Sequence, residues 1–166
     1  MNPSSDGEFK VPFSQLTVVS HLDELESVLT WFDRLTCSAV PEELWMQAQL
    51  ALVEGFTNAV RHAHAHLVPA PQVVLSVEVK ASTLRVEIID RGEPFDFESA
   101  VASLQKEVAA STADPLAREA HWGLVMLLKL RTDYGWSINY SRQEGMANCL
   151  TLSHPLNGKK AGDASC

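Results

Sequence analysis

The spacing of apolar residues changes several times along the chain, and each change marks a predicted element. Residues 11–20 are predicted to form a first strand, in which Pro12 suits a sheet edge. A helical spacing follows, at Leu25, Val28, Leu29 and Phe32. This spacing predicts a helix that Asp23 caps and that ends near Thr36.

A second and longer helix is predicted to open at Pro41, which is followed by Glu42 and Glu43. Proline is preorganised for the first helical turn, and acidic side chains suit the positive end of the helix dipole. The helix is expected to run to about His64 or His66, ahead of two prolines.

Alternating segments in the second half of the chain predict two hairpins. Residues 73–79 and 84–90 both alternate and are joined by a short connection, so they are predicted to pair antiparallel. Residues 136–142 and 148–152 form a closing hairpin around a Glu-Gly turn in the same way.

The segment between the hairpins, residues 91–121, is less regular because glycine and proline interrupt it. It contains an Ala-rich piece, residues 98–110, with helical character. An irregular run of about 30 residues suggests a functional lid or a flexible insertion. An apolar helix is then predicted from Trp122 to Leu130.

The order of elements is therefore strand, two helices, two strands, the irregular segment, a helix and two strands. Strands and helices do not alternate strictly, which argues against a doubly wound parallel sheet. The predicted fold class is α+β: a two-layer sandwich with helices on one face of a mixed or antiparallel sheet. Residues 10–156 would form one domain, and residues 1–9 and 157–166 are expected to be flexible tails because they offer too little burial.

Composition narrows the class of protein. The chain has 166 residues and a formal net charge of −8, so it lacks the basic surface on which nucleic-acid and anionic-membrane binding rely. Its three cysteines are far apart and form no CxxC pair, which argues against a disulfide scaffold or a Cys-rich zinc site. No apolar signal region opens the chain, and a cytoplasmic protein is expected.

Polar residues that could take part in catalysis or bind a metal ion lie on one face of the long predicted helix. At 100° per residue Glu54, Asn58 and His62 fall within an arc of about 80°, with Gln47 and Arg61 within or beside it. Such a stripe is also what any half-exposed helix presents to solvent. A carboxylate can nevertheless act as a general base, and an amide oxygen can bind Mg²⁺.

A histidine string follows on the same helix, at His62, His64 and His66. On a strand all three would share a face and suggest zinc, whereas on a helix His64 points away from the other two. Because no third ligand is apparent, a zinc-dependent hydrolase is the weakest of the functional alternatives.

Two glycine-containing segments complete the candidate chemistry. Asp90 follows directly on a strand, where it could accept a hydrogen bond from an exocyclic amine, and Gly92 would let a flat ring approach the backbone. Gly123 stands at the start of the apolar helix, where free N–H groups suit phosphate. Without a role in binding, the segment at Asp90 would be a tight turn and the segment at Gly123 an ordinary helix start. Neither a Walker nor a Rossmann motif is present.

Taken together these segments resemble the histidine-kinase-like ATPases, also called the GHKL or Bergerat-fold superfamily. Residues 52–63, Leu-Val-Glu-Gly-Phe-Thr-Asn-Ala-Val-Arg-His-Ala, are similar to its N-box in the form found in bacterial anti-sigma-factor serine kinases. Residues 90–96 resemble the first glycine box, and residues 122–133 resemble the second. The resemblance covers about residues 11–155.

The resemblance implies a role for each matching residue. Glu54 would be the catalytic base, Asn58 would bind Mg²⁺, and residues 96–121 would form a lid over the nucleotide. The ATP-binding residues would be Asn58, Arg61, His62, Asp90, Gly92, Phe95, His121, Gly123 and Leu124. Within this set, Arg61 and His62 would sit near the phosphates, and Asp90 would receive the adenine amine above Gly92.

The chain departs from the family at two positions. His121 stands where the family usually has a second glycine, and Asn148 is the nearest candidate for a threonine that supports adenine from the last strand. These departures bear on phosphate contact and kinase turnover more than on nucleotide binding.

The function implied by the resemblance is an ATP- and Mg²⁺-dependent anti-sigma regulatory factor with serine/threonine protein kinase activity. Its partners would be a sigma factor and an anti-sigma-factor antagonist protein, with no direct nucleic-acid or membrane contact, and it would form a homodimer. The acidic chain suits a sigma factor, whose DNA-binding surfaces are basic. The alternative is a catalytically weak or inactive nucleotide-binding module that regulates by binding proteins.

Overall fold

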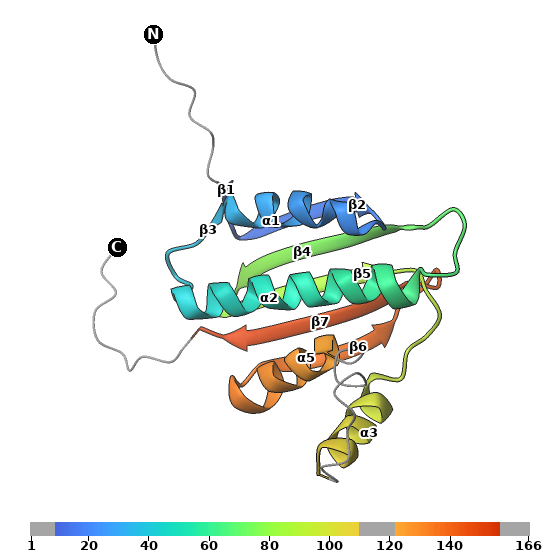
Figure 1. Ribbon diagram of the computed structural model, residues 1–166. Coiled ribbons are helices and arrows are strands. Elements are labelled where there is room, and N and C mark those ends of the chain that lie inside the picture. The colour runs from blue at the N-terminus through green and yellow to red at the C-terminus, as the bar shows by residue number, and fades with distance from the viewer. Residues whose placement is uncertain (1–8, 110–121, 157–166) are drawn as a thin grey trace.

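A five-stranded antiparallel sheet forms the base of the computed structural model, which describes residues 9–109 and 122–156. Its strands follow the order β2-β4-β5-β7-β6. Their bounds are Phe13–Val19 for β2, Gln72–Lys80 for β4, Thr83–Asp90 for β5, Ser137–Arg142 for β6 and Asn148–Pro155 for β7. Figure 1 shows the strands side by side, with helices in front of them.

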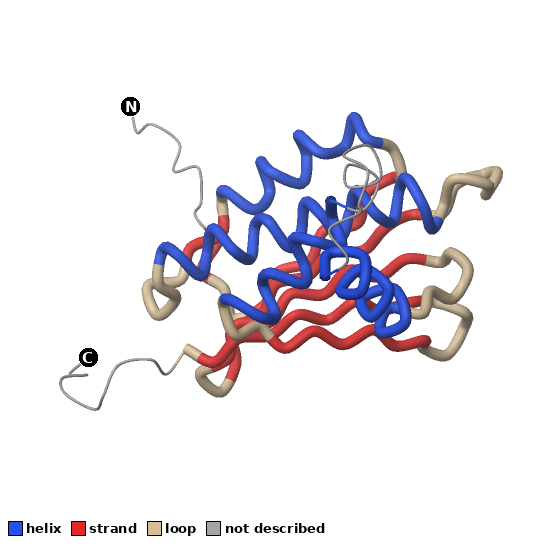
Figure 2. The backbone as a smooth tube through the Cα atoms, turned by 60° about the horizontal axis from the view of Figure 1, so that its bottom comes forward, coloured by secondary structure: helices blue, strands red, loops and turns tan. Residues whose placement is uncertain are grey.

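The helices lie on one side of this sheet, as Figure 2 shows most clearly. They are α1 (Leu25–Asp33), α2 (Glu42–Asn58), α3 (Phe97–Ala109) and α5 (Trp122–Asp133). The central helix α2 lies between α1 and α5, whereas α3 lies beyond the sheet margin next to α5 (Figure 1). The predicted α+β sandwich is therefore confirmed, and the sheet is antiparallel throughout.

The core lies between α2 and the middle of the sheet. Leu52 and Phe56 of α2 and Leu75, Val77 and Val86 of the central strands are fully buried. Burying one such side chain contributes about 1.5–3 kcal/mol, so the apolar stripe of α2 ties the helix firmly to the strands. The opposite, polar side of α2 is thereby held in a set orientation.

Several predicted boundaries were wrong by a turn. Asp23 does not cap the first helix: His21 precedes a 3₁₀ turn (Leu22–Glu24), and its ring accepts a hydrogen bond from the Asp23 amide at 3.3 Å. The helix α1 ends at Asp33, since Leu35–Thr36 form a short strand, β3. This strand pairs in parallel with β1 (Phe9–Lys10), so Phe9 belongs to an element rather than to a tail.

The long helix keeps its predicted length but not a uniform geometry. Pro41 caps α2, and beyond Asn58 the chain continues as a π-helical turn, Ala59–Ala63. The amide of His64 bonds to the carbonyl of Ala59 at 2.9 Å and closes this wider turn. π-Turns of this kind occur often at functional sites because they redirect side chains.

Two of the three cysteines fall within the described residues. Cys37 and Cys149 are free thiols. Within the described ranges no helix has both the length and the apolar character needed to cross a membrane. Of the predicted lid, residues 97–109 form α3, and residues 110–121 lie outside the described part of the chain.

Candidate nucleotide-binding site

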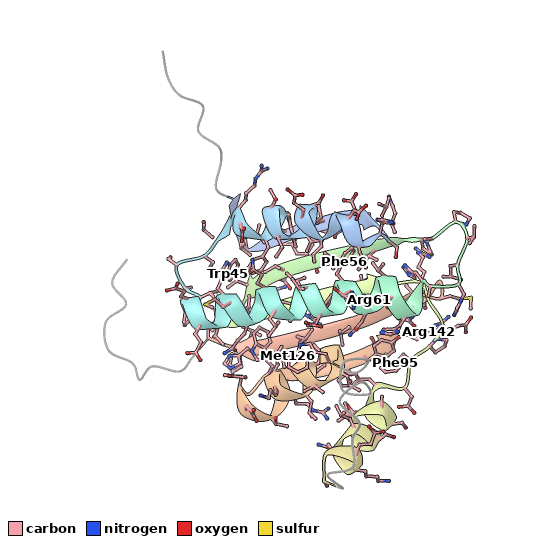
Figure 3. The ribbon with its side chains drawn as sticks, viewed as in Figure 1. Trp45, Phe56, Arg61, Phe95, Met126 and Arg142 are labelled. Atoms are coloured by element: carbon pink, nitrogen blue, oxygen red, sulfur yellow. The ribbon has the colours of Figure 1, made fainter. Side chains whose placement is uncertain are left out.

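A cavity of about 560 Å³ opens at the C-terminal end of α2, between that helix, α3, the start of α5 and the sheet. Its floor is a row of cross-strand neighbours, Tyr140, Leu150 and Ile88, on the helix-facing side of β6, β7 and β5. In Figure 3 Phe95 and Arg142 lie at this end of the molecule, near the end of α2 where Arg61 is labelled. Ligand pockets typically have about 300–1,000 Å³, so the cavity suits a small molecule.

The structure brings most of the predicted site residues to this cavity. The residues of the predicted set that line it are Asn58, His62, Asp90, Phe95, Gly123 and Leu124. Arg61 is exposed and is not among the lining residues. His121 lies outside the described residues. Gln47, which the helical wheel placed near the stripe, instead accepts a hydrogen bond from the indole of buried Trp136 at 2.8 Å.

The start of α5 packs directly against the polar stripe of α2. A Cβ built on Gly123 would lie 2.9 Å from Asn58 Oδ1 and 2.9 Å from Glu54 Oε2. Both side-chain oxygens therefore reach the same point beside the helix start. A side chain at this position would displace the ends of Asn58 and Glu54, so glycine lets the backbone of α5 come this close while both side chains keep their positions.

Glu54 is half-buried at this contact. Burial raises the pKa of its carboxyl group, and the positive charge of Arg61 opposes that rise. A carboxylate with a raised pKa binds a proton more readily, which is the property that a general base near neutral pH requires.

The turn after β5 is held by the carboxylate of Asp90. Its Oδ1 atom accepts hydrogen bonds from the Gly92 amide and from the Asn148 side-chain amide, both at 2.8 Å. Within the described part of the chain Oδ2 forms no hydrogen bond, although Asp90 is 8% exposed and lines the cavity. This atom is therefore available to accept a hydrogen bond from a molecule in the cavity.

Gly92 does not line the cavity but allows its wall to close. A Cβ on this residue would lie 2.4 Å from the carbonyl oxygen of Ala63 and 2.6 Å from the Ala63 Cβ. The turn after β5 thus packs backbone to backbone against the π-turn that ends the long helix. This contact brings the stripe of α2 and Asp90 into one site.

The histidine string has a structural rather than a metal-binding arrangement. His64 is 3% exposed, and its Nε2 accepts a hydrogen bond from the Arg91 amide at 3.0 Å, which makes Nδ1 the protonated atom facing Ser20 Oγ at 2.9 Å. His62 and His66 are exposed. Across the described ranges no group of three or more His, Cys, Asp or Glu residues could hold a metal ion.

His64 should make the fold sensitive to mild acid. Burial lowers the pKa of its ring, with the Asp90 charge opposing, so the fold favours the neutral form. The stabilisation that neutral His64 gives the fold is complete above the pKa of histidine in the unfolded chain, about 6.5. It is lost as the pH falls through the lower pKa that His64 has in the folded protein. We expect the free energy of unfolding to fall between pH 7 and 5, by up to about 1.4 kcal/mol per pH unit from one proton.

Urea unfolding at several pH values tests this expectation. His64→Gln, which keeps a hydrogen-bond acceptor but cannot become charged, should show a shallower pH slope than the original chain. His66→Gln, at an exposed position of the same string, should not. Equal slopes in all three proteins would show that His64 is not the acid-sensitive group.

Sequence reasoning missed the apolar walls of the cavity. The lining residues outside the predicted set include the floor residues Ile88, Tyr140 and Leu150, and Phe97, Ala100, Ser103, Leu104 and Glu107 of α3. Strand alternation gave a usable signal, because Ile88 lies two residues before Asp90 and so shares its face. No comparable signal identified α3, whose packing is a tertiary property.

The charges along the cavity are mostly negative. Among the described lining residues Asp90, Glu93 and Glu107 are acidic, and His62 is the one residue of basic type. A polyanion would therefore need a cation beside it to enter this site.

The chain is similar to a known domain family over most of its length. A family profile described as the histidine kinase-like ATPase domain matches residues 18–154, which is most of the chain. No curated protein matches the chain. Among solved structures, a chain of the SiaB–SiaC complex from Pseudomonas aeruginosa is similar with a TM-score of 0.49 and 15% identity, over 84% of this chain and 88% of that one.

Proposed function

Because the chain belongs to the family of histidine kinase-like ATPase domains, we propose that its cavity binds ATP with Mg²⁺ and that it acts as an anti-sigma regulatory factor with serine/threonine protein kinase activity. One observation carries this proposal: Asn58, Asp90 and Gly123, from three separate elements, line a single cavity of about 560 Å³. The substrate of the kinase would be an anti-sigma-factor antagonist.

The base of the nucleotide would occupy the end of the cavity at β5. Asp90 Oδ2 would accept a hydrogen bond from the amino group of adenine. Ile88 and Leu150 offer the flat ring an apolar floor. Phe95 and Tyr140, whose rings meet edge to face with centroids 6.0 Å apart, would border it.

The phosphates would lie at the start of α5, beside Asn58. An amide oxygen is a ligand type that Mg²⁺ takes, so Asn58 fits the ion, which would neutralise phosphate charge in an otherwise acidic site. The first amides of a helix have no intrahelical partner and can donate to a phosphate. Gly123 and Leu124 stand there, and His62 lines the same cavity.

Glu54 would act as the general base. In the proposed step it takes the proton of a serine hydroxyl, the serine oxygen bonds to the γ-phosphorus, and the bond from that phosphorus to the bridging oxygen breaks as ADP leaves. Phosphoryl transfer of this kind depends mainly on positioning and charge stabilisation. The half-buried position of Glu54 beside the start of α5, together with the raised pKa of its carboxyl group, supports the role of general base.

The protein partners belong to the same proposal. An antagonist protein would present the serine, and a sigma factor would bind the acidic chain through its basic surface, with complex formation weakening as salt screens the charges. A homodimer in the cytoplasm is the expected setting.

A second candidate is a nucleotide-binding regulatory module without turnover. The observation that favours it is His121, which replaces a glycine where the family usually has one beside the phosphates. Such a module would bind ATP in the same cavity and act through protein contacts alone.

Glu54→Gln separates the two candidates. We expect ATP with Mg²⁺ at 100 times its dissociation constant to stabilise both the original chain and this variant by about 2.7 kcal/mol, since the substitution leaves the cavity in place. Transfer of labelled γ-phosphate to the candidate antagonist should occur only with the original chain. Thermal unfolding and autoradiography measure the two effects.

Each outcome has a clear meaning. Stabilisation without transfer in both proteins would favour the regulatory module. Transfer by the Glu54→Gln variant at the original rate would remove Glu54 from the catalytic role. Absence of any nucleotide-dependent stabilisation would contradict nucleotide binding itself.

A further inference from the structure

Arg131, in the last turn of α5, contacts two neighbouring residues at the start of α3. Its Nη1 atom donates a hydrogen bond to Glu98 Oε1 at 2.9 Å. Its Cζ atom lies over the Phe97 ring, 5.7 Å from the ring centroid, where a cation is attracted to an aromatic face. Arg131 and Glu98 are 33 positions apart in the chain, so these contacts join two separate elements.

The helix α3 forms one wall of the cavity. The lining residues of this wall are Phe97, Ala100, Ser103, Leu104 and Glu107. Arg131 does not line the cavity itself. It contacts the wall through Phe97, which is 4% exposed and belongs both to the wall and to the contact with the guanidinium group. Arg131 therefore acts on the cavity through another residue.

The described residues attach α3 to the rest of the fold in few other ways. In Figure 1 the helix lies beyond the sheet margin, next to α5. Its buried apolar side chains include Phe97, Val101 and Leu104. Asp96 caps the helix by accepting hydrogen bonds from the amide and the hydroxyl of Ser99, at 2.9 and 2.7 Å, which joins α3 only to the residue before it. Within the described part of the chain, Arg131 is the one side chain of another element that hydrogen-bonds to α3.

The two contacts of Arg131 support each other because each alone is weak. Glu98 is 71% exposed, and an ion pair with so exposed a side chain contributes little by itself. Arg131 is 28% exposed, and its planar guanidinium group both lies over the aromatic ring and pairs with the carboxylate. Lysine carries the same charge but has no planar group, so arginine is the residue type suited to both contacts.

We propose that Arg131 is a positioning residue that holds α3 in place as a wall of the cavity and thereby slows the release of a bound nucleotide. This inference rests on the proposed nucleotide function. Without both contacts of Arg131, the start of α3 would separate from α5 more often, and each separation would open the cavity on that side. The residues that would touch the nucleotide on α2 and β5 stay unchanged, so the main effect falls on the rate of release.

Stopped-flow release of a fluorescent ATP analogue with Mg²⁺ into excess unlabelled ATP measures this rate. We expect about tenfold faster release from Arg131→Gln, the combined size of one exposed ion pair and one cation–π contact. Arg131→Lys keeps the charge but not the planar group and should show about a threefold increase. Lys129→Gln removes a positive charge from an exposed position of α5 and should release at the original rate. An unchanged rate in Arg131→Gln would overturn the proposal.

A double-mutant cycle separates the direct contact from a general loss of stability. Glu98→Gln should speed release about threefold in the original chain. In the Arg131→Gln background it should have no further effect, since the partner of Glu98 has already been removed there. Effects that multiply instead would show that the two residues act independently and would contradict the role given to their contact.

Hydrogen exchange of the α3 amides tests the same contact without nucleotide. A helix of 13 residues is marginal on its own, so α3 should lose protection when it separates from α5. In Arg131→Gln we expect its amides to exchange about tenfold faster, and those of α2 to exchange at the original rate. If the original chain binds no nucleotide, the proposed function fails, and this measurement alone decides whether Arg131 holds α3. Equal exchange of the α3 amides in both proteins would show that it does not.

Discussion

Gly92→Ala should destabilise the protein by about 3 kcal/mol, the upper end of the range for overpacking a closed contact. The added Cβ would lie 2.4 Å from the Ala63 carbonyl oxygen and 2.7 Å from the Ala63 Cα. Both are backbone atoms, so no side-chain rotation relieves the contact. Either the turn after β5 or the π-turn must move, and Asp90 moves with the former.

Urea unfolding measures the effect, and Gly123→Ala provides the matched control. The Cβ of that variant meets only the ends of Glu54 and Asn58, which can rotate, and alanine favours a helix over glycine by about 1 kcal/mol. We therefore expect Gly123→Ala to remain as stable as the original chain while its nucleotide affinity falls. A Gly92→Ala variant within about 0.5 kcal/mol of the original would show that the two turns are not closely packed.

Asn58→Ala should remove the part of ATP affinity that depends on Mg²⁺, a loss of about 100-fold at saturating metal. The reason is that Asn58 Oδ1 lies at the start of α5 in a cavity whose charged lining residues are mostly acidic, so that an ion would have to be held there for a polyphosphate to bind. Stability should change little, since alanine suits a helix interior better than asparagine does.

Calorimetry with and without EDTA tests this expectation. In the original chain chelation of Mg²⁺ should weaken ATP binding strongly, and in Asn58→Ala it should have almost no further effect. Thr57→Ala, on the neighbouring position of the same helix but outside the cavity lining, should behave like the original. A Mg²⁺ dependence that survives in Asn58→Ala would exclude Asn58 as the ligand.

The two predictions illustrate different kinds of information in the chain. Asn58 could be singled out from the sequence because helical periodicity places it on one face with Glu54 and His62. The need for glycine at position 92 could not be predicted from the sequence. Its close neighbour Ala63 is 29 positions away and meets it only through the packing of two turns. A glycine in a turn has many ordinary explanations until that neighbour is known.

Boundary errors have a similar physical origin. Asp23 is a good cap by residue type, but the chain enters α1 through a 3₁₀ turn that local preference does not specify. The short pairing of β1 with β3 depends on two-residue segments, which are too short for any periodicity to appear. The π-turn at the end of α2 packs against the turn after β5, and the periodicity along the chain carried no signal for it.

The sequence by itself determined the fold class, the antiparallel hairpins and the polar face of the long helix, because periodicity is a local property that each segment carries alone. Only the tertiary structure decided which of these residues meet. Strand register set Asn148 between Asp90 and Arg142, and the contact of α5 with α2 set Gly123 beside Asn58. Such meetings depend on pairings between residues far apart in the chain, and these pairings follow from how all the elements pack together.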